Sequence, residues 1–242
     1  MEKIWRLILD VAREPGANMS IDEAIMICQS EASSAEALPT LRIYKWLYPC
    51  ISIGRFQKPL TFTLSPKGRE EGEGGNNLPI VRRPTGGGAV FHNEFGFTYS
   101  IACREDSNAV PKGASNSYRE IHLGILRALR NFGFKVELCA PVAEEGRSYP
   151  AKFCFDQPVR FDIVSGFRKI AGAAQRRKQG VILHQGEVSL GLDVWLRWPY
   201  NKMVKMVTNS LSRRLKARFI EERISDREMS LAEELLKMTG GV

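Results

Sequence analysis

The sequence has no apolar stretch long enough to span a bilayer, and few residues of the kinds that build metal or disulfide sites. Its N-terminus lacks the uninterrupted apolar segment of a signal peptide, because charged residues recur from Glu2 to Arg13. The five cysteines include no C-x-x-C pair, which argues against a zinc site and a secreted disulfide framework. We therefore expect a cytoplasmic protein in a reducing compartment, with no membrane contact and no bound metal.

Motifs of several enzyme classes are also missing. No Gly-x-Ser-x-Gly elbow is present, which disfavours a serine hydrolase. The three glycines at 86–88 are not followed by Gly-Lys-Ser/Thr, so they do not form a P-loop. The only histidines, His92, His122 and His184, are scattered and match no metal pattern. We interpret His122 as structural, whereas His184 could act as a base or orient a ligand.

What is present is an ordinary globular composition with a basic balance. Hydrophobic residues make up 43% and charged residues 26% of the 242, which excludes disorder as the main state. The formal net charge is +8, yet the sequence contains no long Lys/Arg block and no helix-turn-helix signature. A basic balance would suit nucleic acid, an anionic membrane or an acidic protein, and composition alone does not choose among them; without those signatures, nucleic acid is not the expected main ligand.

The predicted strands outnumber the predicted helices and mostly follow one another directly. This pattern predicts an α+β fold, with a largely antiparallel sheet and flanking helices. We expect a catalytic domain over residues 1–200, a basic helical appendage over 201–242, and a monomer. One helix begins near Asn18 or Ser20, either of which could cap it, and a second covers 115–133. Strands are predicted over 4–10, 41–46, 50–55, 78–83, 89–92, 95–103, 135–139, 153–156, 160–164, 167–177 and 181–190.

Three segments could carry chemistry. Arg82 and Arg83 precede Gly86, Gly87 and Gly88, and such a glycine turn lets backbone N–H groups approach an anion. A bare glycine turn between two strands is an equally good interpretation. Lys169 lies among small residues in 166–177, where strand alternation would place it on one face with Ala171; taken alone, it is more typical of a solvated strand lysine than of a ligand contact. Cys154, between two phenylalanines, is by itself more typical of core packing than of a nucleophile.

Taken together, these segments resemble the lipoate/biotin protein-ligase superfamily. The segment RRPTGGGAVFH resembles its ligand-binding loop, and KIAGAAQRR resembles its lysine motif. NMSIDEAI, SIGRFQ and LHQGEVSL resemble further motifs in the same order, so the resemblance covers about residues 4–200. CFDQPVRFDI is similar to the segment that holds the nucleophile in cysteine-dependent octanoyltransferases, which places that nucleophile at Cys154. The implied fold is the class II synthetase-like catalytic domain.

The resemblance implies a two-step acyl transfer. The Cys154 thiolate would attack the thioester of octanoyl-acyl carrier protein, and a lysine of a lipoyl-domain protein would then accept the octanoyl group. That acceptor would be the glycine cleavage H protein or the E2 subunit of a 2-oxoacid dehydrogenase. Lys169 would bind the acyl carbonyl and stabilise the developing oxyanion, and its charge would also favour the thiolate form of Cys154. The implied substrate-binding residues are Arg82, Arg83, Gly86, Gly87, Gly88, His92, Gly172, Ala173 and His184.

Two departures keep alternatives open. The family's Asp after the histidine is Asn93 here, and the segment 61–77 lacks a clear family pattern. An ATP-dependent lipoate–protein ligase would share the loop and the fold, but would need ATP and Mg²⁺, whereas the transferase would need no cofactor. A biotin ligase fits the cysteine and lysine motifs less well. A non-catalytic protein that binds lipoyl domains or acyl carrier protein is the alternative from another class.

Overall fold

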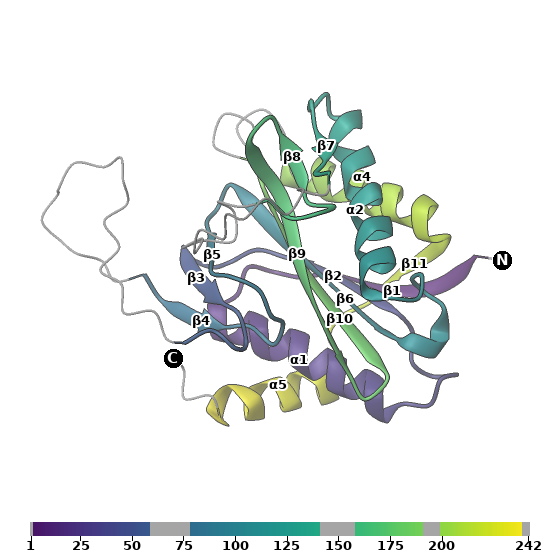
Figure 1. Cartoon of the computed structure of the whole chain (residues 1–242). Coiled ribbons are helices and arrows are strands. Elements are labelled where there is room, and N and C mark those ends of the chain that lie inside the picture. The colour runs from purple at the N-terminus through teal and green to yellow at the C-terminus, as the bar shows by residue number, and fades with distance from the viewer. Residues whose placement is uncertain (1, 59–77, 141–157, 191–198, 239–242) are drawn as a thin grey trace, which may run out of the picture.

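The computed structural model describes residues 2–58, 78–140, 158–190 and 199–238. Within them, a large twisted sheet lies between two layers of helices (Figure 1). Its eight strands run in the order β11-β1-β2-β6-β10-β9-β8-β7. Their bounds are β1 Lys3–Leu9, β2 Thr40–Tyr44, β6 Gly96–Arg104, β7 Glu137–Leu138, β8 Ile163–Ser165, β9 Arg168–Lys178, β10 Val181–Ser189 and β11 Ala217–Glu221.

The large sheet is mostly antiparallel, as predicted. Only β1 pairs in parallel, with β2 on one side and β11 on the other. The pairs from β2 to β7 are all antiparallel. A smaller sheet, β4-β3-β5, lies at one end of the large one; its strands are β3 Cys50–Ile53, β4 Ile80–Arg82 and β5 Val90–His92.

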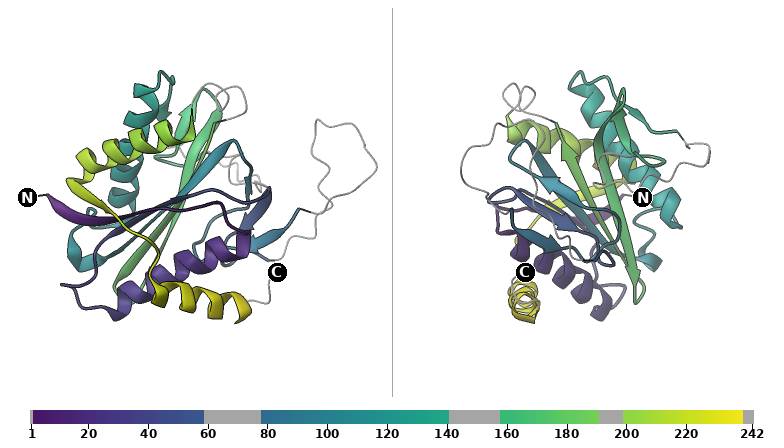
Figure 2. Two further views of the ribbon diagram at one scale, coloured as in Figure 1. Left: turned by 180° about the vertical axis from the view of Figure 1, so that it is seen from behind. Right: turned by 60° about the vertical axis from the view of Figure 1, so that its left-hand side comes forward.

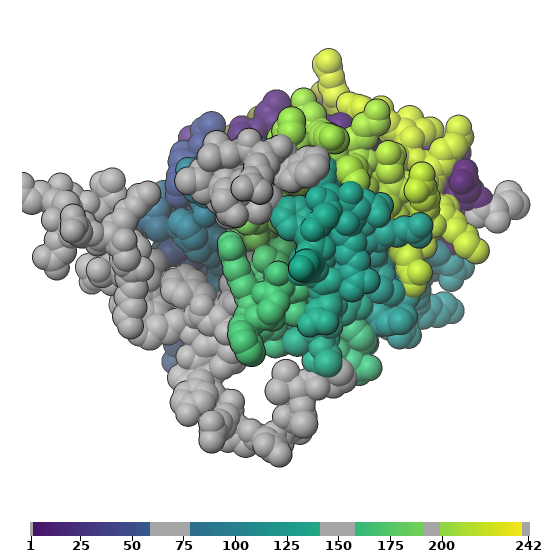
Figure 3. All heavy atoms as spheres, turned by 90° about the horizontal axis from the view of Figure 1, so that it is seen from above, coloured from purple at the N-terminus to yellow at the C-terminus, as the bar shows by residue number. Residues whose placement is uncertain are grey.

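Two pairs of helices cover the two faces of the large sheet (Figure 2). Helices α1 (Pro15–Glu31) and α5 (Asp226–Met238) pack on one face, and α2 (Ala114–Asn131) and α4 (Tyr200–Leu215) on the other. In the space-filling view of Figure 3, α2 lies in teal beside the green β8–β9 hairpin. The α+β class expected from the strand pattern is confirmed.

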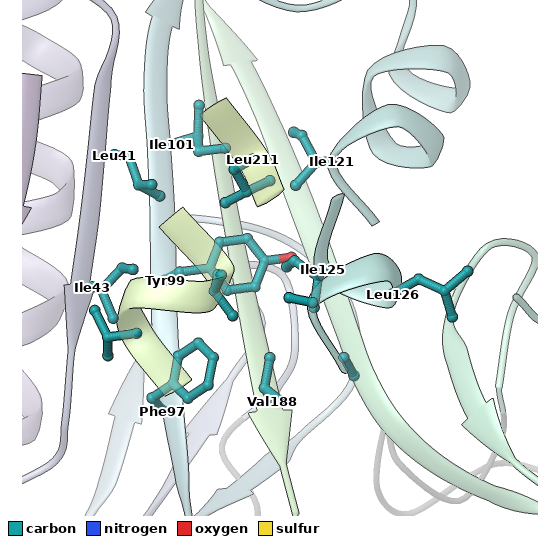
Figure 4. Packing of buried hydrophobic residues seen from close by; sticks show 14 of the residues in the cluster. Leu41, Ile43, Phe97, Tyr99, Ile101, Ile121, Ile125, Leu126, Val188 and Leu211 are labelled. Carbon is teal, nitrogen blue, oxygen red and sulfur yellow. The ribbon is translucent and has the colours of Figure 1, made fainter. Parts of the chain in front are cut away.

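Alternation along the strands explains why both faces are covered. Neighbouring residues such as Leu7 and Ile8, or Ile182 and Leu183, belong to different hydrophobic clusters, one under each helix layer. The larger cluster lies beneath α2 and α4, and Figure 4 shows side chains from β2, β6, β10 and both helices meeting there. Burial on both faces fixes the register, because a one-residue slip would exchange the two faces.

The start of α1 differs from the prediction. The helix begins at Pro15, which suits its first turn, and neither Asn18 nor Ser20 caps it. Both residues lie inside the helix and are buried. Asn18 instead donates through its side chain to the carbonyl oxygens of Arg13 and Lys45, which ties α1 to the end of β2. The polar residues of this segment therefore serve tertiary contacts.

The segment predicted to be entirely helical after residue 200 also differs in one part. Residues 217–221 form the strand β11, which pairs in parallel with β1. The strand follows Lys216, whose left-handed backbone (φ 52°) ends α4. Helix α4 contributes Met203, Val207 and Leu211 to the larger hydrophobic cluster. The C-terminal residues therefore complete an edge of the sheet and the covering of one face.

Among the helices of the described residues, none combines the length and the hydropathy that a bilayer crossing requires.

Candidate active site

A narrow cavity lies where the small sheet meets β9, β10 and α1. Its volume is about 50 Å³, and it is open to the surface. Its wall consists mostly of apolar and small residues with a few polar groups, as is usual for small-molecule sites. The lining residues are Met19, Tyr44, Trp46, Ser52, Arg83, Gly87, Val90, His92, Thr98, Gly172, Ala173, Ala174, Gln185, Gly186 and Glu187.

The glycine loop, residues 84–88, forms one side of this cavity. Arg83 is buried, and its guanidinium donates hydrogen bonds to the carbonyl oxygens of Gly86, Gly88 and Ser52. Gly87 has a φ of 89°, a conformation that favours glycine. A Cβ on Gly54 would lie 2.1 Å from the Gly87 carbonyl oxygen, so only glycine allows this close approach. Arg83 thus shapes the loop as well as bordering the cavity.

Arg82 holds the neighbouring turn. Its side chain donates to the carbonyl oxygens of Gly54, Arg55 and Gln57, the last at 2.6 Å. The donors of both arginines that we predicted to contact substrate therefore reach backbone carbonyls. In this structure they position the loop, and a direct contact with an acyl substrate stays a prediction.

Lys169, at the start of β9, is buried and forms an ion pair with Asp162. Its Nζ lies 2.8 Å from Asp162 Oδ2, and both side chains are almost completely buried. A Cβ on Gly172 would lie 2.1 Å from Lys169 Cε, so the lysine side chain passes directly over this glycine. Gly172 and Ala174 share one face of β9, and Ala174 Cβ lies 3.8 Å from a Cβ built on Gly87. Lys169 and the glycine loop therefore flank the same stretch of β9.

Asp162 is fixed by several donors besides Lys169. The Tyr118 hydroxyl donates to its Oδ1 at 2.5 Å, and the backbone N–H of Val159 donates to its Oδ2 at 2.7 Å. Burial, followed by the charge of Asp162, raises the pKa of Tyr118 well above its ordinary value, so the phenol keeps its proton. The ammonium group of Lys169 is thus held at a defined position beside the cavity.

A bulge in β9 modifies the predicted alternation around Lys169. Ile163 pairs with Ala171, but Val164 pairs with Lys169, so one extra residue, Ile170, lies between the two pairs. Ile170 and Ala171 both pack into the larger hydrophobic cluster, which strict alternation does not allow. The prediction that Lys169 and Ala171 share a face is therefore wrong, because the bulge interrupts the alternation between them.

His92 borders the cavity and connects two sheets. Its Nε2 lies 2.7 Å from Ser52 Oγ in the small sheet, and its Nδ1 lies 3.1 Å from Glu187 Oε2 in β10. The indole of Trp46 stacks on the imidazole, with 4.1 Å between ring centroids. Thr98 donates to the same carboxylate oxygen of Glu187 and accepts from Trp46 Nε1 at 2.7 Å.

The other predicted histidine of the site, His184, has a different environment. It is completely buried, and its nitrogens lie within hydrogen-bond distance of Tyr99 Oη and Gln175 Nε2. Burial, with a smaller contribution from His122, lowers the pKa of His184 well below its ordinary value. It belongs to an aromatic cluster with Tyr118 and His122 and does not border the cavity. A direct substrate contact by His184 stays a prediction.

A buried polar network supports the floor of the cavity. The Thr85 hydroxyl donates to Gln185, and Gln185 donates to Asp22 of α1, both at 2.7 Å. Asp22 also pairs with Arg42 of β2 at 2.8 Å, and neither side chain of this pair is exposed. The network links the glycine loop to α1 and the large sheet, so the loop is anchored on the rigid part of the fold.

Several predicted features lie partly or wholly outside the described residues. Cys154 and the segment 61–77 are not described, so the predicted convergence of Cys154 and Lys169 stays a prediction. Asn93 is described: its side-chain oxygen accepts the backbone N–H of Phe95 at 2.9 Å and shapes the turn after β5. An aspartate could accept the same bond, so this contact does not require the family's usual residue.

Sequence reasoning missed four residues that the structure places at or beside the cavity: Ser52, Glu187, Asp162 and Asp22. Ser52, Asp22 and Glu187 lie within a strand or helix, Asp162 directly precedes β8, and all four side chains are buried. A buried carboxylate needs a cation or several donors. A polar residue in an apolar segment was thus the available signal in the sequence, although it does not show which side chain would pair with it.

Comparison with known proteins agrees with this geometry. The family model described as lipoyl protein ligase A/B catalytic domain matches residues 14–239. The octanoyltransferase LipM of Brevibacillus brevis is 35% identical over 246 residues, which cover 98% of this chain and 85% of the relative. The octanoyltransferase LipM of Symbiobacterium thermophilum is 38% identical over 223 residues, covering 90% and 76%.

A solved structure, lipoate-protein ligase A bound with ATP, has the same fold. It superposes with a TM-score of 0.74 at 21% identity, covering 97% of this chain and 94% of that one. The cavity, the glycine loop and Lys169 all lie within the matched residues 14–239. The chain belongs to the lipoyl protein ligase A/B catalytic-domain family.

Proposed function

We propose that this protein is an octanoyltransferase, which moves an octanoyl group from acyl carrier protein, through a thioester on Cys154, to a lysine of a lipoyl-domain protein. The observation that supports this most directly is the buried Lys169 ammonium, held by Asp162 at 2.8 Å beside a narrow, mostly apolar cavity. The relatives named as octanoyltransferases, at 35% and 38% identity over most of the chain, support the same reaction.

The proposed chemistry uses the cation in two ways. A nearby ammonium stabilises a thiolate and so favours the ionised form of Cys154. The same ammonium can donate to the acyl oxygen when negative charge develops during attack on the carbonyl. Because the ion pair with Asp162 already holds Lys169, the donor is in place before the acyl group arrives.

No ATP is needed for this sequence of steps. The exchange of one thioester for another is nearly isoenergetic, and the transfer of an acyl group from a thioester to an amine is downhill. The segment that carries Cys154 leads directly to Asp162, since only seven residues separate them in CFDQPVRFD. The proposed nucleophile therefore lies on the same short stretch of chain as Asp162, and Asp162 is the ion-pair partner of the Lys169 cation.

The proposed partners suit the charge of the chain. Its formal net charge is +8, and an acidic carrier protein would be attracted to it over a distance of about one Debye length, roughly 8–10 Å. We propose octanoyl-acyl carrier protein as donor and a lipoyl domain as acceptor. The cysteines in the described residues are all free thiols, which fits action in the cytoplasm.

Intact mass spectrometry tests the proposal. The protein is mixed with octanoyl-acyl carrier protein without ATP, and Cys154→Ala is treated in parallel. We expect one octanoyl adduct on the native chain and none on the variant. No adduct on either protein would contradict the transferase, and a product that forms only with ATP and octanoate or lipoate would establish a ligase.

A further inference from the structure

Ser52, His92 and Glu187 form a hydrogen-bonded chain along the wall of the cavity. The three residues come from β3, β5 and β10, and all three line the cavity. The distances are 2.7 Å from Ser52 Oγ to His92 Nε2 and 3.1 Å from His92 Nδ1 to Glu187 Oε2. A hydroxyl, an imidazole and a carboxylate in this order can pass a proton from a bound ligand to the imidazole.

The surrounding donors fix the direction of this chain. Glu187 Oε2 also accepts a hydrogen bond from Thr98, so an ionised carboxylate has two donors, and one of them must be His92 Nδ1–H. Nε2 is then an acceptor for the Ser52 hydroxyl. Arg83 Nη1 donates to the same Ser52 oxygen at 3.2 Å, which leaves the hydroxyl hydrogen for His92.

The chain lies next to Lys169. Glu187 on β10 is the direct cross-strand partner of Gly172 on β9, and such partners have Cβ positions about 4.5–5.5 Å apart on one face. Gly172 is the residue over which the Lys169 side chain passes. The hydroxyl–imidazole–carboxylate chain and the ammonium therefore flank the same small area of the cavity wall.

No other histidine can take this part. His122 of α2 and His184 of β10 are buried in the aromatic cluster, and neither borders the cavity. Burial lowers the pKa of His122 to about 4 and that of His184 well below its ordinary value, so both stay neutral near pH 7. His92 is thus the one imidazole in this sequence of three histidines that faces the acyl cavity.

We propose that Ser52, His92 and Glu187 form the proton acceptor for the second half of the transfer, in which the acceptor lysine attacks the octanoyl thioester. This inference rests on the proposed function. As the amine nitrogen bonds to the acyl carbon, its N–H proton passes to Ser52 Oγ while the Ser52 proton passes to His92 Nε2. The bond from the acyl carbon to Cys154 Sγ then breaks and the sulfur leaves as a thiolate. The amide is neutral, and the proton remains on His92 beside Glu187 until water removes it.

The charges around His92 suit this role. Glu187 faces it from β10, Arg83 lies beyond Ser52 at the end of β4, and Cys50 pairs with it across β3 and β5. Burial, and then Glu187, raise the pKa of Cys50, so this thiol stays neutral. Tyr44 of β2 also stays neutral, because burial and Asp22 raise its pKa. The imidazolium would therefore have one adjacent carboxylate as its counter-ion.

The test separates the two half-reactions. Octanoyl-enzyme is formed with octanoyl-acyl carrier protein, and its rate of formation is measured by intact mass. The acyl-enzyme is then treated with a lipoyl domain in single turnover. In His92→Gln we expect thioester formation within about threefold of the native rate, and amide formation slower by about 100-fold or more. Ser52→Ala should show the same split, and Glu187→Gln a smaller loss of about tenfold.

A pH profile distinguishes proton transfer from a merely structural role. With methoxyamine as the acceptor, which is unprotonated over the working range, the native rate should show one titration step that His92→Gln lacks. His122→Asn is the matched control, because it removes an imidazole that does not border the cavity; both half-reactions should stay within about threefold. Equal losses in both half-reactions of His92→Gln, or normal amide formation from its acyl-enzyme, would overturn the relay. Absence of any native acyl-enzyme would instead overturn the proposed function.

Discussion

The ion pairs Arg42–Asp22 and Lys169–Asp162 are both buried, yet they are built for different tasks. The Arg42 guanidinium donates to Asp10, Asp22 and Asn18, and all of its N–H groups point to partners of the fixed scaffold. Asp22 accepts further hydrogen bonds from Tyr44, Ser100 and Gln185. This pair links α1 to the sheet, and it reaches the cavity through Gln185, which donates to Asp22 and lines the cavity wall.

The Lys169 pair places a compact charge on a flexible stem over a glycine at the cavity wall. A lysine ammonium can turn its three donors toward a new acceptor, whereas a planar guanidinium whose five N–H groups are all engaged cannot. The comparison teaches that burial and ion pairing alone do not mark a reactive group. Whether a buried ion-paired group can react with a ligand depends on its residue type and on its distance from the cavity.

The largest effect should come from breaking the structural pair. Arg42→Met leaves Asp22 buried without its cation and Asp10 with Arg13 alone, and we expect a loss of about 3–5 kcal/mol in the free energy of unfolding. Urea denaturation followed by circular dichroism measures it. Arg104→Met removes a surface pair with Asp106 and should cost less than about 1 kcal/mol. Similar losses of unfolding free energy in Arg42→Met and Arg104→Met would show that the buried Arg42 pair has no special structural role.

Next comes the reactive pair, where activity and stability should separate. Lys169→Met should slow formation of the octanoyl-enzyme by about 10²–10³-fold, because the acyl oxygen loses its charged donor. It should also destabilise the fold, since Asp162 is left buried. The double variant Lys169→Met/Asp162→Asn removes that unpaired charge, so stability should recover while the rate does not. Recovery of the rate in the double variant would rule out a chemical role for Lys169.

Acid should affect the two regions in different pH ranges. His122 lies on the buried side of α2 near Asp162, and burial lowers its pKa to about 4 from an ordinary 6.5. The unfolded chain therefore binds the extra proton first, so stability falls as the pH drops from about 6.5 to 4, by roughly 3 kcal/mol. His122→Asn can still donate to the Phe161 carbonyl oxygen but cannot titrate, so the contribution of His122 to this slope should disappear, while that of His184, whose pKa burial also lowers, should remain.

The Arg42 region should respond only in stronger acid. Burial pushes the pKa of Asp10 upward, but hydrogen bonds from Arg13 and Arg42 outweigh it and leave that pKa below its ordinary 3.8. Its contribution to stability is thus present above about pH 4 and lost as the pH falls through the lowered value. A slope between pH 4 and 6.5 that is the same in His122→Asn as in the native protein would contradict the assignment to His122.

The smallest effect should follow from a single methyl group. A Cβ in Gly172→Ala would lie 2.1 Å from Lys169 Cε, so the lysine must move while its charge remains. We expect octanoyl-enzyme formation to slow by about 10–100-fold, less than in Lys169→Met. Gly86→Ala is the control for stability, because its Cβ meets no atom within 4 Å. An unchanged rate in Gly172→Ala would show that octanoyl-enzyme formation does not depend on the exact position of the Lys169 ammonium.

The sequence predicted most of the local elements and the fold. Alternating apolar residues predicted most strands, and the order of the motifs predicted the fold, because both signals lie in neighbouring residues. The partner of Lys169 could not be predicted, since Asp162 reaches it through a hairpin with a bulge at Ile170. Ser52 and Glu187 lie 135 residues apart, and only the meeting of the two sheets brings them to His92.

Some residue types fit two tasks. Arg82 and Arg83 were predicted to bind substrate because guanidinium groups suit anions; here Arg82 donates to backbone carbonyls of residues 54–57 and Arg83 to those of the glycine loop, and a substrate contact stays a prediction. Asn18 and Ser20 are good helix caps, yet Pro15 begins the helix and Asn18 bonds to two carbonyl oxygens elsewhere. Local propensity was outweighed in each case by tertiary hydrogen bonds.

The parallel pairing of β1 with β11 has a consequence for biosynthesis. Lys3 pairs with Ala217, so during translation β1 has to wait for a partner 214 residues later in the chain. At about 5–20 residues per second, the delay is roughly 10–40 seconds. During that time one edge of β1 has no strand beside it, and an unpaired edge invites pairing with another chain. Chaperones that shield nascent chains should therefore matter more for the yield of this protein than its final stability suggests.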